Sequence, residues 1–599
     1  MGTVLAVVLF VGILATGSAA GQAVEIDECQ TLNTPGQTYE LNQSITDSTA
    51  DPCLQIGVGA DDVVLDGKGF TVDGVNKTTG SEGISISANN ATVKNFGNVT
   101  RWATGIDLDG SNATLTDNTV NNNGGDGIRP TGSSNSELTG NTANNNGGDG
   151  INLVDGNFID SLNNLLTDNT ANDNGADGIR LQRTSDSELT DNTANDNRGD
   201  GISLTDNSED NVVEDNTAND NDGIGIHLDN TNGNDLVNNT VFNNGFHGVV
   251  LENIADFTLV EENEITDNTG HGLYLNDAWD NDINNNTLVN NDGDGLRSDV
   301  SINNQIHDNE ITDNRGDGIL LRDSDNNTAS GNLVENNQNG IVISGLGFGA
   351  DSLETNSGRI QPESVEESGN TFTDDTSRNN AEWDFVIVTS GINEFGVAQT
   401  DPADFPVTNL NIGDSTNPDT TLSFNADNIR LRSVGTPQPD PADAANIGRY
   451  FEAESVGGDE FNGEPLEIQQ NGGSFLNVSL SYENGDVAGL DESALTLRRF
   501  NTTATEWENV PGTVAEPSVN LVSASITQFS DFGAFVEGAE SVGDCVNRRD
   551  LSRGEENLEC PFDRDVQRGG SREGLDRDTG RGGTGEHRDS ATERRNRRR

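Results

Sequence analysis

The sequence predicts an all-β protein: a coil of stacked strands with three faces, followed by β-sandwich-like modules and a disordered tail. Three observations lead to this prediction. A unit of 22 to 24 residues recurs about a dozen times, the apolar residues of each unit fall in short groups of period two, and asparagine returns at two fixed places in the unit. Units of this length cannot bury their apolar faces alone, so they must stack on their neighbours.

The repeat occupies residues 83–345 and is marked by a glycine that precedes an aliphatic residue. One step, from Gly150 to Gly178, is 28 residues long, and its extra length predicts an outward loop over residues 154–164. The marker glycines are Gly83, Gly105, Gly127, Gly150, Gly178, Gly201, Gly225, Gly248, Gly272, Gly295, Gly318 and Gly340.

Each unit carries three apolar groups, which predicts three inward strands per turn of the coil. In one unit they are Ile179 with Leu181, then Leu189, then Ala194. Asparagine tolerates turn conformations, and its amide both donates and accepts hydrogen bonds. Copies in successive rungs are therefore expected to form ladders at the corners. One ladder contains Asn141, Asn169, Asn192, Asn216, Asn239, Asn263, Asn286 and Asn309, and a second follows five residues later in every unit.

The pattern resembles the right-handed parallel β-helix family, which implies a rod of about 12 to 14 rungs. The entry segment Val63–Gly74 reads V-V-L-D-G-K-G-F-T-V-D-G and is similar to the opening rungs of NosD-type proteins, the periplasmic copper-binding accessory family of nitrous-oxide reduction. The same opening occurs in many archaeal surface proteins, so it specifies architecture better than activity. The NosD resemblance implies metal handling as one hypothesis.

Composition changes along the chain predict seven segments. The module that contains A-L-T-L-R-R-F-N at 494–501 resembles the PGF-pre-PGF β-sandwich of archaeal surface proteins, although the Pro-Gly-Phe sorting signal is missing. The predicted segments are a signal peptide (1–20), an N-terminal cap with the first rungs (21–82), the coil (83–345), a C-terminal cap and linker (346–380), a β-rich module (381–439), the β-sandwich module (440–537) and a disordered tail rich in Arg, Asp and Glu (538–599).

The charge balance indicates a protein that works in high salt. The formal net charge is −69, and only three residues are lysines. Salt screens the self-repulsion of such a surface, so we expect a halophilic archaeal source. Phosphate would be repelled, which excludes nucleic acid as a partner of the folded body. The signal peptide and the cysteines indicate a secreted or cell-surface protein, expected to be monomeric and without a transmembrane helix once mature. Asn-x-Ser/Thr sequons would permit glycosylation, so a glycoprotein is expected.

The cysteines Cys29 and Cys53 lie one rung apart at the amino-terminal end of the coil, where a disulfide would secure an exposed edge. No zinc site is indicated by the spacing of the remaining two, Cys545 and Cys560.

Equivalent residues of successive rungs form columns, so any site should be built from columns. The residue after the marker aliphatic points outward and provides the binding candidates Arg129, Arg180, His227, Tyr274 and Arg297. The residue before the marker glycine is usually Asp, but it is His247 and His271 in two consecutive rungs.

Two interpretations of these columns remain open. In the simpler one, Asp is a turn residue and the histidines are substitutions at that turn. In the other, rungs seven to ten hold a site: His271, Tyr274, Arg297 and Asp294 would be catalytic residues of a polysaccharide lyase or glycoside hydrolase, or His247 and His271 would bind a metal. Carboxylates would suit Ca²⁺ and the histidine pair copper, and the sequence requires neither. The favoured hypothesis is polysaccharide or glycan binding without catalysis.

Overall fold

The computed structural model describes residues 22–75, 80–156, 161–345 and 370–389, and most of 405–537. It also describes two short paired strands, β54 (Asn547–Arg549) and β55 (Glu556–Leu558). Two compact units are present, Met1–Ser541 and Val542–Arg599. The predicted signal peptide and, apart from these two strands, the predicted disordered tail lie outside the described residues. No helical segment in the described ranges has the length and hydropathy of a membrane span.

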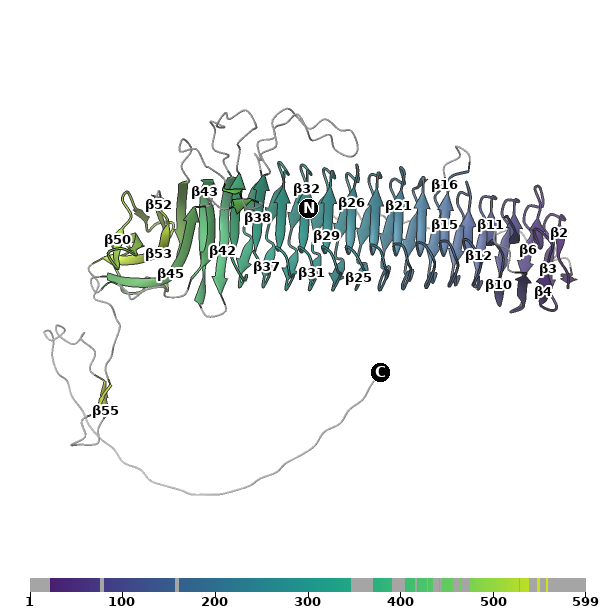
Figure 1. The fold of residues 1–599 in the computed structure, drawn as a ribbon, viewed down its shortest axis with the longest axis horizontal. Coiled ribbons are helices and arrows are strands. Elements are labelled where there is room, and N and C mark those ends of the chain that lie inside the picture. Colours follow the sequence, from purple (N-terminus) through teal and green to yellow (C-terminus); the bar gives the residue numbers. More distant parts are fainter. Residues whose placement is uncertain are drawn as a thin grey trace, which may run out of the picture. The chain divides into compact units, whose positions relative to one another are not determined.

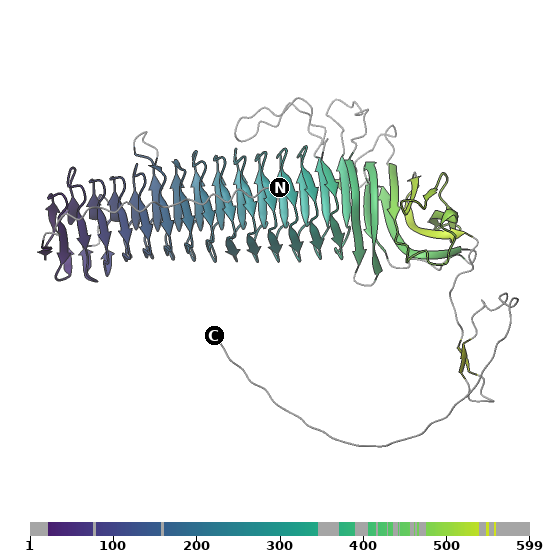
Figure 2. The same cartoon turned by 180° about the vertical axis from the view of Figure 1, so that it is seen from behind.

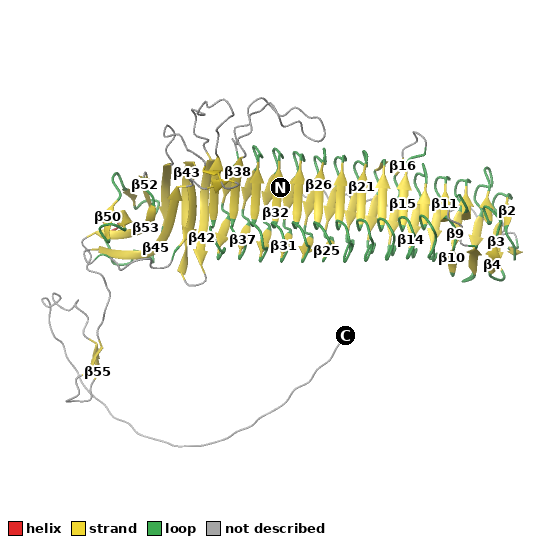
Figure 3. Cartoon of the chain, in the orientation of Figure 1, coloured by secondary structure: helices red, strands yellow, loops and turns green. Residues whose placement is uncertain are grey.

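The compact unit Met1–Ser541 begins with a parallel coil of three strand columns, one for each face (Figure 1, and from behind in Figure 2). Figure 3 shows its strands joined by loops, without an α-helix in the described part. The first face, which carries the marker residues, consists of β2 (Gln30–Leu32), β5 (Leu54–Ile56), β8 (Glu82–Ile86), β11 (Thr104–Leu108), β13 (Ile128–Pro130), β15 (Ile151–Val154), β18 (Ile179–Gln182), β21 (Ile202–Thr205), β23 (Ile226–Asp229), β26 (Val249–Glu252), β29 (Leu273–Asn276), β32 (Leu296–Asp299), β35 (Ile319–Arg322), β38 (Ile341–Gly345) and β41 (Phe385–Thr389).

The other two faces follow in each turn. The second face consists of β1 (Val24–Ile26), β3 (Thr38–Leu41), β6 (Val64–Asp66), β9 (Thr92–Lys94), β12 (Thr114–Thr116), β14 (Glu137–Thr139), β17 (Leu165–Thr167), β20 (Glu188–Thr190), β22 (Val212–Glu214), β24 (Asp235–Val237), β27 (Leu259–Glu261), β30 (Asp282–Asn284), β33 (Gln305–His307), β36 (Thr328–Ser330) and β39 (Thr371–Thr373). The third face consists of β4 (Ile45–Ser48), β7 (Thr71–Gly74), β10 (Asn98–Thr100), a series of single bridges from Thr119 to Thr240, and β25 (Thr240–Phe242), β28 (Glu264–Thr266), β31 (Thr287–Val289), β34 (Glu310–Thr312), β37 (Leu333–Glu335) and β40 (Thr376–Arg378).

Two inward residues from each typical first-face strand, and one from each turn of the other two faces, build a continuous apolar column. Ile179, Leu181, Leu189 and Ala194 are all fully buried, as the three-group pattern predicts. The prediction of an all-β, three-faced parallel coil is confirmed. The predicted loop 154–164 is described only in part, and it includes β16 (Ser161–Leu162), which pairs with β19 (Thr184–Ser185) of the next rung.

The corners are held by buried asparagine ladders. The Asn192 backbone N–H and Nδ2 both donate to Oδ1 of Asn216, at 2.9 and 3.0 Å, while Nδ2 of Asn216 donates to the Leu189 carbonyl at 2.8 Å. This arrangement repeats from Asn118 to Asn332, and a second ladder runs from Asn123 to Asn337. The residue before each ladder asparagine has a positive φ in most rungs, 57° at Asp191 for example, which Asn, Asp and Gly tolerate best.

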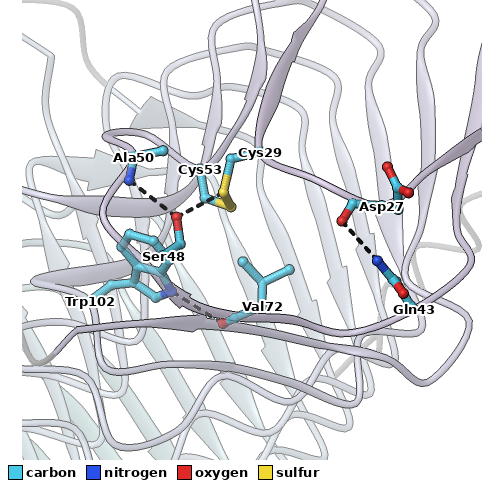
Figure 4. Close-up of a disulfide and its surroundings, with 8 residues drawn as sticks. All are labelled: Asp27, Cys29, Gln43, Ser48, Ala50, Cys53, Val72 and Trp102. Carbon is cyan, nitrogen blue, oxygen red and sulfur yellow. Dashed lines mark hydrogen bonds between the residues drawn. A yellow bond between two sulfur atoms is a disulfide. The ribbon is translucent and has the colours of Figure 1, made fainter.

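The cysteines Cys29 and Cys53 are joined by a disulfide at the amino-terminal end of the coil (Figure 4). The Ser48 hydroxyl lies 2.9 Å from the Cys29 sulfur and accepts a hydrogen bond from the Ala50 N–H. Nearby, the buried Trp102 indole donates to the Val72 carbonyl at 3.2 Å. The first rungs are therefore tied by one covalent link and by side-chain hydrogen bonds.

The coil continues past residue 345, where the sequence indicated a cap and linker. Strands β39, β40 and β41 pair in parallel with β36, β37 and β38 and add one more rung. The ladder step to this rung, from Asn332 to Asp375, is 43 residues long, so the insertion hides the period from sequence inspection. The segments predicted as linker (346–380) and first β-rich module (381–439) therefore each contribute residues to the coil.

All three faces of the coil then continue into the carboxyl-terminal module. Strand β42 pairs in parallel with β39 and β40 but antiparallel with β43, and β41 pairs antiparallel with β44, so the strand direction changes at this point. The module consists of β42 (Phe405–Asp414), β43 (Asn417–Asp427), β44 (Ile429–Ser433), β45 (Ala444–Ser455), β46 (Glu460–Phe461), β47 (Glu464–Pro465), β48 (Phe475–Ser481), η1 (Glu492–Ala494), β49 (Leu495–Asn501), β50 (Glu506–Asn509), β51 (Val514–Glu516), β52 (Leu521–Ile526) and β53 (Ser530–Glu537).

Candidate functional site

A column of Asp and His side chains runs along the edge of the first face, at the position before the marker glycine. Each Asp accepts, through Oδ1, the backbone N–H of the corresponding residue in the next rung: Asp177 from Asp200 and Asp294 from Asp317, both at 2.8 Å. Glycines beside the column make room for these bonds. A Cβ on Gly270, for example, would lie 2.4 Å from Nδ1 of His247. Asp in this column is therefore a turn residue, as the simpler interpretation states.

The two histidines perform the same structural task. Nδ1 of His247 accepts the His271 N–H at 2.8 Å, and Nδ1 of His271 accepts the Asp294 N–H at 2.8 Å. Their rings stack with centroids 4.8 Å apart and planes 6° apart. Burial lowers the pKa of both to about 4, helped by His271 and Arg297 for His247 and by Arg297 for His271. Both imidazoles are therefore neutral at pH 7 and carry their proton on Nε2.

Exposed and half-buried rings extend this pair into a surface that we call the aromatic platform: Phe246, His247, His271 and Tyr274. The Phe246 ring meets His247 edge-on at 5.6 Å and is 60% exposed. Tyr274 lies 5.2 Å from His247 and 5.5 Å from His271. Sequence reasoning missed Phe246, because an aromatic residue at a turn has no partner in the repeat pattern.

Arg297 and two acids form the border of the platform. The Arg297 guanidinium lies 5.7 Å from the Tyr274 ring centre and pairs with Asp299 at 3.1 Å and with Asp294 at 3.7 Å. The Tyr274 hydroxyl donates to Asp299 at 3.1 Å, and burial together with this carboxylate raises its pKa to about 12. Burial also raises the pKa of Asp294. Asp299, buried between Arg297 and Arg322, was not among the predicted site residues.

His227 lies on the same face but in a different environment. Its Nδ1 and Nε2 lie 3.0 Å from the carboxylates of Asp200 and Glu252, in the rungs before and after it. Burial lowers its pKa, but these two carboxylates outweigh burial and raise the pKa to about 10. His227 is therefore a charged clamp across three rungs rather than part of the platform.

The remaining binding candidates lie several rungs from the platform. Arg129 pairs with Asp107 at 2.9 Å. Arg180 is half-buried beside Asp149 and Asp177, and it makes no ion pair with the described residues. Burial, reinforced by the neighbouring Asp177, raises the pKa of Asp149 to about 7. The five predicted binding residues thus share one face but not one site.

The histidine pair is poorly arranged to share a metal ion. Both Nδ1 atoms already accept backbone N–H groups. Two ligand nitrogens on one zinc ion lie at most about 4 Å apart, because each bond is about 2 Å long, and the centroids of these two parallel rings are 4.8 Å apart. Within the described ranges, no group of three or more His, Cys, Asp or Glu residues is placed to hold a metal.

The catalytic candidates His271, Tyr274, Arg297 and Asp294 do converge, but most of their polar atoms already make hydrogen bonds within the protein. Nδ1 of His271 and Oδ1 of Asp294 accept backbone N–H groups, and the Tyr274 hydroxyl donates to Asp299. A general base needs a free lone pair within reach of the substrate. Nε2 of His271 lies 3.5 Å from Nη1 of Arg297. Among the described groups of this cluster, the Nε2–H of His247 and the outer edge of Arg297 remain as donors for a ligand, and Oδ2 of Asp294, 3.7 Å from Arg297, remains as an acceptor.

Family comparisons agree with the coil. The model described as "Right handed beta helix region" matches residues 40–172 and 104–259, and the model described as "Periplasmic copper-binding protein (NosD)" matches residues 213–345 and 290–381. The predicted resemblance to β-helix repeats and to NosD is confirmed at this level, whereas the archaeal surface type and the PGF-pre-PGF module remain predictions. Among curated proteins, no sequence is significantly similar to this chain.

Several solved structures are similar to this chain at low identity. The A-module of mannuronan C-5 epimerase AlgE4 from Azotobacter vinelandii is 18% identical and covers 61% of this chain and 90% of its own, with a TM-score of 0.31. The periplasmic alginate epimerase AlgG is 14% identical (62% and 83%, TM-score 0.30), and the Dettilon tailspike protein is 14% identical (86% and 87%, TM-score 0.32). Similarities of this size carry no conclusion about fold or activity.

Proposed function

We propose that the protein binds polysaccharide or glycan along the first face of its right-handed β-helix coil without catalysing a reaction. It does so as a secreted or cell-surface protein of a halophilic archaeon. The observation that carries this proposal is the aromatic platform, whose rings are partly exposed in a chain with only 5% aromatic residues. Rings of this kind stack on the apolar faces of sugars, and the Nε2–H of His247 and the outer edge of Arg297 beside them suit sugar hydroxyls.

The state of the polar groups favours binding over catalysis. A hydrolase needs two carboxyl groups free to donate or accept a proton, but Oδ1 of Asp294 already accepts the Asp317 N–H and Oδ1 of Asp317 accepts from the Asn339 side chain. The neutral histidines interrupt the carboxylate column between Asp200 and Asp294, so a ligand meets less negative charge there than elsewhere on the face.

A glycan array probed in molar NaCl tests the proposal. The double variant Phe246→Ser/Tyr274→Ala is expected to lose at least tenfold in affinity for the bound glycan. Phe257→Ser is the matched control, since Phe257 is also exposed but lies at a corner away from the platform. Equal affinity of the double variant and the wild type would contradict the proposal.

The rival activity is tested with the same protein. Uronate polymers are incubated in molar salt while unsaturated products and reducing ends are followed. If the wild type releases products and His271→Ala does not, the protein is a lyase or hydrolase and the non-catalytic proposal is wrong.

A further inference from the structure

The third face carries two outward columns that the first face lacks. Its inward residues, such as Ala171 and Ala194, are fully buried, so the residues on either side of each point outward. One column consists of Thr119, Thr142, Thr170, Thr193 and Thr217. The other consists of Asn121, Asn144, Asn172, Asn195 and Asn219. Together we call these ten residues the Thr/Asn strip.

The asparagines of the strip are locked in one orientation. Oδ1 of Asn144 accepts the Asn172 N–H at 2.7 Å, and Oδ1 of Asn172 accepts the Asn195 N–H at 2.8 Å. Asn121, Asn195 and Asn219 accept in the same way from the rung that follows each of them. Because the oxygen must face a donor, each NH₂ group faces away from it. Neither these NH₂ groups nor the threonine hydroxyls have a hydrogen-bond partner among the described residues.

The strip itself is uncharged, although the protein is strongly acidic. Acidic corner residues border it on both sides, Asp168, Asp191 and Asp215 before the threonine column and Asp173, Asp196 and Asp220 after the asparagine column. An anionic polymer lying on the strip would therefore meet carboxylates along both edges. A neutral polymer would meet donors and hydroxyls one rung apart, about 4.8 Å, already held in place so that little side-chain entropy is lost on binding.

A hollow of about 420 Å³ adjoins the asparagine column at the corner toward the first face. It forms because two successive rungs have Gly147 and Gly175, without side chains, at the position where the next rung has Arg198. The backbone packs closely here, since a Cβ on either glycine would lie less than 2.5 Å from a backbone oxygen. Asn145 and Asp173 also line it, so donors and acceptors both face the hollow. Its volume lies within the range of small-ligand sites.

We propose that the Thr/Asn strip and this hollow bind an uncharged, hydroxyl-rich linear polysaccharide that lies parallel to the coil axis. The Asn NH₂ groups donate to sugar hydroxyls, the threonine hydroxyls donate or accept, and Arg198 donates to a sugar oxygen at the hollow. This surface is separate from the aromatic platform, so it goes beyond the function proposed above and can be tested without it.

The test uses the full chain in molar NaCl and isothermal titration with hydroxyethyl cellulose, laminarin and dextran. We expect the wild type to bind at least one of these neutral polymers. The variant Thr142→Val/Thr170→Val/Thr193→Val removes the hydroxyls but keeps β-branched residues, and it is expected to weaken that binding at least tenfold. Asn172→Asp/Asn195→Asp keeps the acceptor oxygens but removes the donors, and it should have a similar effect.

The matched control carries the same change on the second face, Thr139→Val/Thr167→Val/Thr190→Val, and should bind as the wild type does. If the wild type binds none of the three polymers, or if the second-face control loses as much affinity as the strip variant, the proposal is wrong. Loss of binding in Phe246→Ser/Tyr274→Ala but not in the strip variants would place neutral glycans on the platform and would also overturn it.

Discussion

The buried Asn ladders and the Asp/His column are built on the same coil, yet they run in opposite directions. In an Asn ladder, Oδ1 accepts from the preceding rung, and Nδ2 donates both to the next Oδ1 and to a backbone carbonyl. In the Asp/His column, the side chain accepts from the following rung, and the ionised Asp members have no donor to offer. The Asn ladder therefore satisfies every polar group, whereas the column collects acceptors and, where they are Asp, like charges.

This difference explains which substitutions each column tolerates. A ladder position needs a donor and an acceptor in one short side chain, and only asparagine combines these at that length. The Asp/His column needs one acceptor, so imidazole Nδ1 can replace a carboxylate, as at His247 and His271. The Asp/His column can therefore hold several residue types, including ones that bind a ligand, while a ladder position needs asparagine to keep the fold stable.

Removing one ladder amide should have the largest effect. Asn216→Ala leaves the Asn192 N–H, the Asn192 Nδ2 and the Leu189 carbonyl without the bonds that they now make. Unsatisfied buried groups cost about 1–3 kcal/mol each, so the free energy of unfolding should fall by about 3–6 kcal/mol. Denaturant unfolding in molar salt measures it.

The outer column provides the control for that experiment. Asn195→Ala removes an amide that accepts one N–H at a half-exposed position, where water can replace it. A change of less than about 1 kcal/mol is expected for it. Equal losses in the two variants would show that the buried amides are no more important than the outer ones.

Asp375 occupies a position of the Asn ladder where other rungs have asparagine. Replacing it therefore tests the ladder by adding an amide instead of removing one. Its Oδ1 accepts from Asn332, but Oδ2 is buried without a partner, at the place where other rungs have an NH₂ group. By strand register, the carbonyl left without that donor is Ala329. Asp375→Asn should restore the bond and stabilise the protein at pH 8, by up to about 4 kcal/mol.

The stabilisation expected from Asp375→Asn should depend on pH, because Asp375 itself titrates. Burial raises the pKa of Asp375 to about 7, from 3.8 in the unfolded chain. The folded state therefore holds a proton that the unfolded state releases, and its contribution to stability is present below about pH 4 and lost as the pH rises through 7. The advantage of the Asn variant should shrink as the pH falls from 8 to 4. An advantage that stays constant over this range would contradict the protonated acid.

The coil could be predicted from the sequence because the residues that recur with its period are the same residues that form its core and its ladders. Aliphatic spacing predicted the three inward columns, and the two asparagine series predicted the ladders. A third column of buried polar residues, which includes Ser187, Asn211 and Asn234, was missed because Ser, Thr and Asn alternate in it. The rung at 370–389 was missed because an insertion separates it from the repeat.

The candidate site was less predictable, because its chemistry depends on which atoms are already bonded. Sequence position grouped His227 with His247 and His271, but the first is clamped by Asp200 and Glu252 and charged, while the other two are neutral acceptors. Phe246 and Asp299 have no repeat signal of their own. Nothing in the spacing shows that the Asp294 oxygen and the Tyr274 hydroxyl are occupied.

The smallest expected effects come from exchanging one acceptor for another in the Asp/His column. His247→Asn keeps an oxygen near the position of Nδ1, so the His271 N–H remains bonded and the free energy of unfolding should change by less than about 1 kcal/mol. His247→Ala leaves that N–H without its acceptor and should cost about 1–2 kcal/mol. Losses of equal size would mean that ring stacking with His271, rather than the hydrogen bond, holds this turn.

Between Asp200 and Asp317, Ile224 is the one residue of this column whose side chain has no hydrogen-bond acceptor. A substitution at Ile224 can therefore add an acceptor, where the His247 variants exchange or remove one. The His247 N–H in the following rung has no hydrogen-bond partner among the described residues, unlike its counterparts at His271 and Asp294. Ile224→Asn would place an acceptor there and should raise the free energy of unfolding by about 0.5–1 kcal/mol, measured against Ile224→Val. Because imidazole, carboxylate and amide would then all serve at one position, a gain would show that the column selects for an acceptor and not for charge.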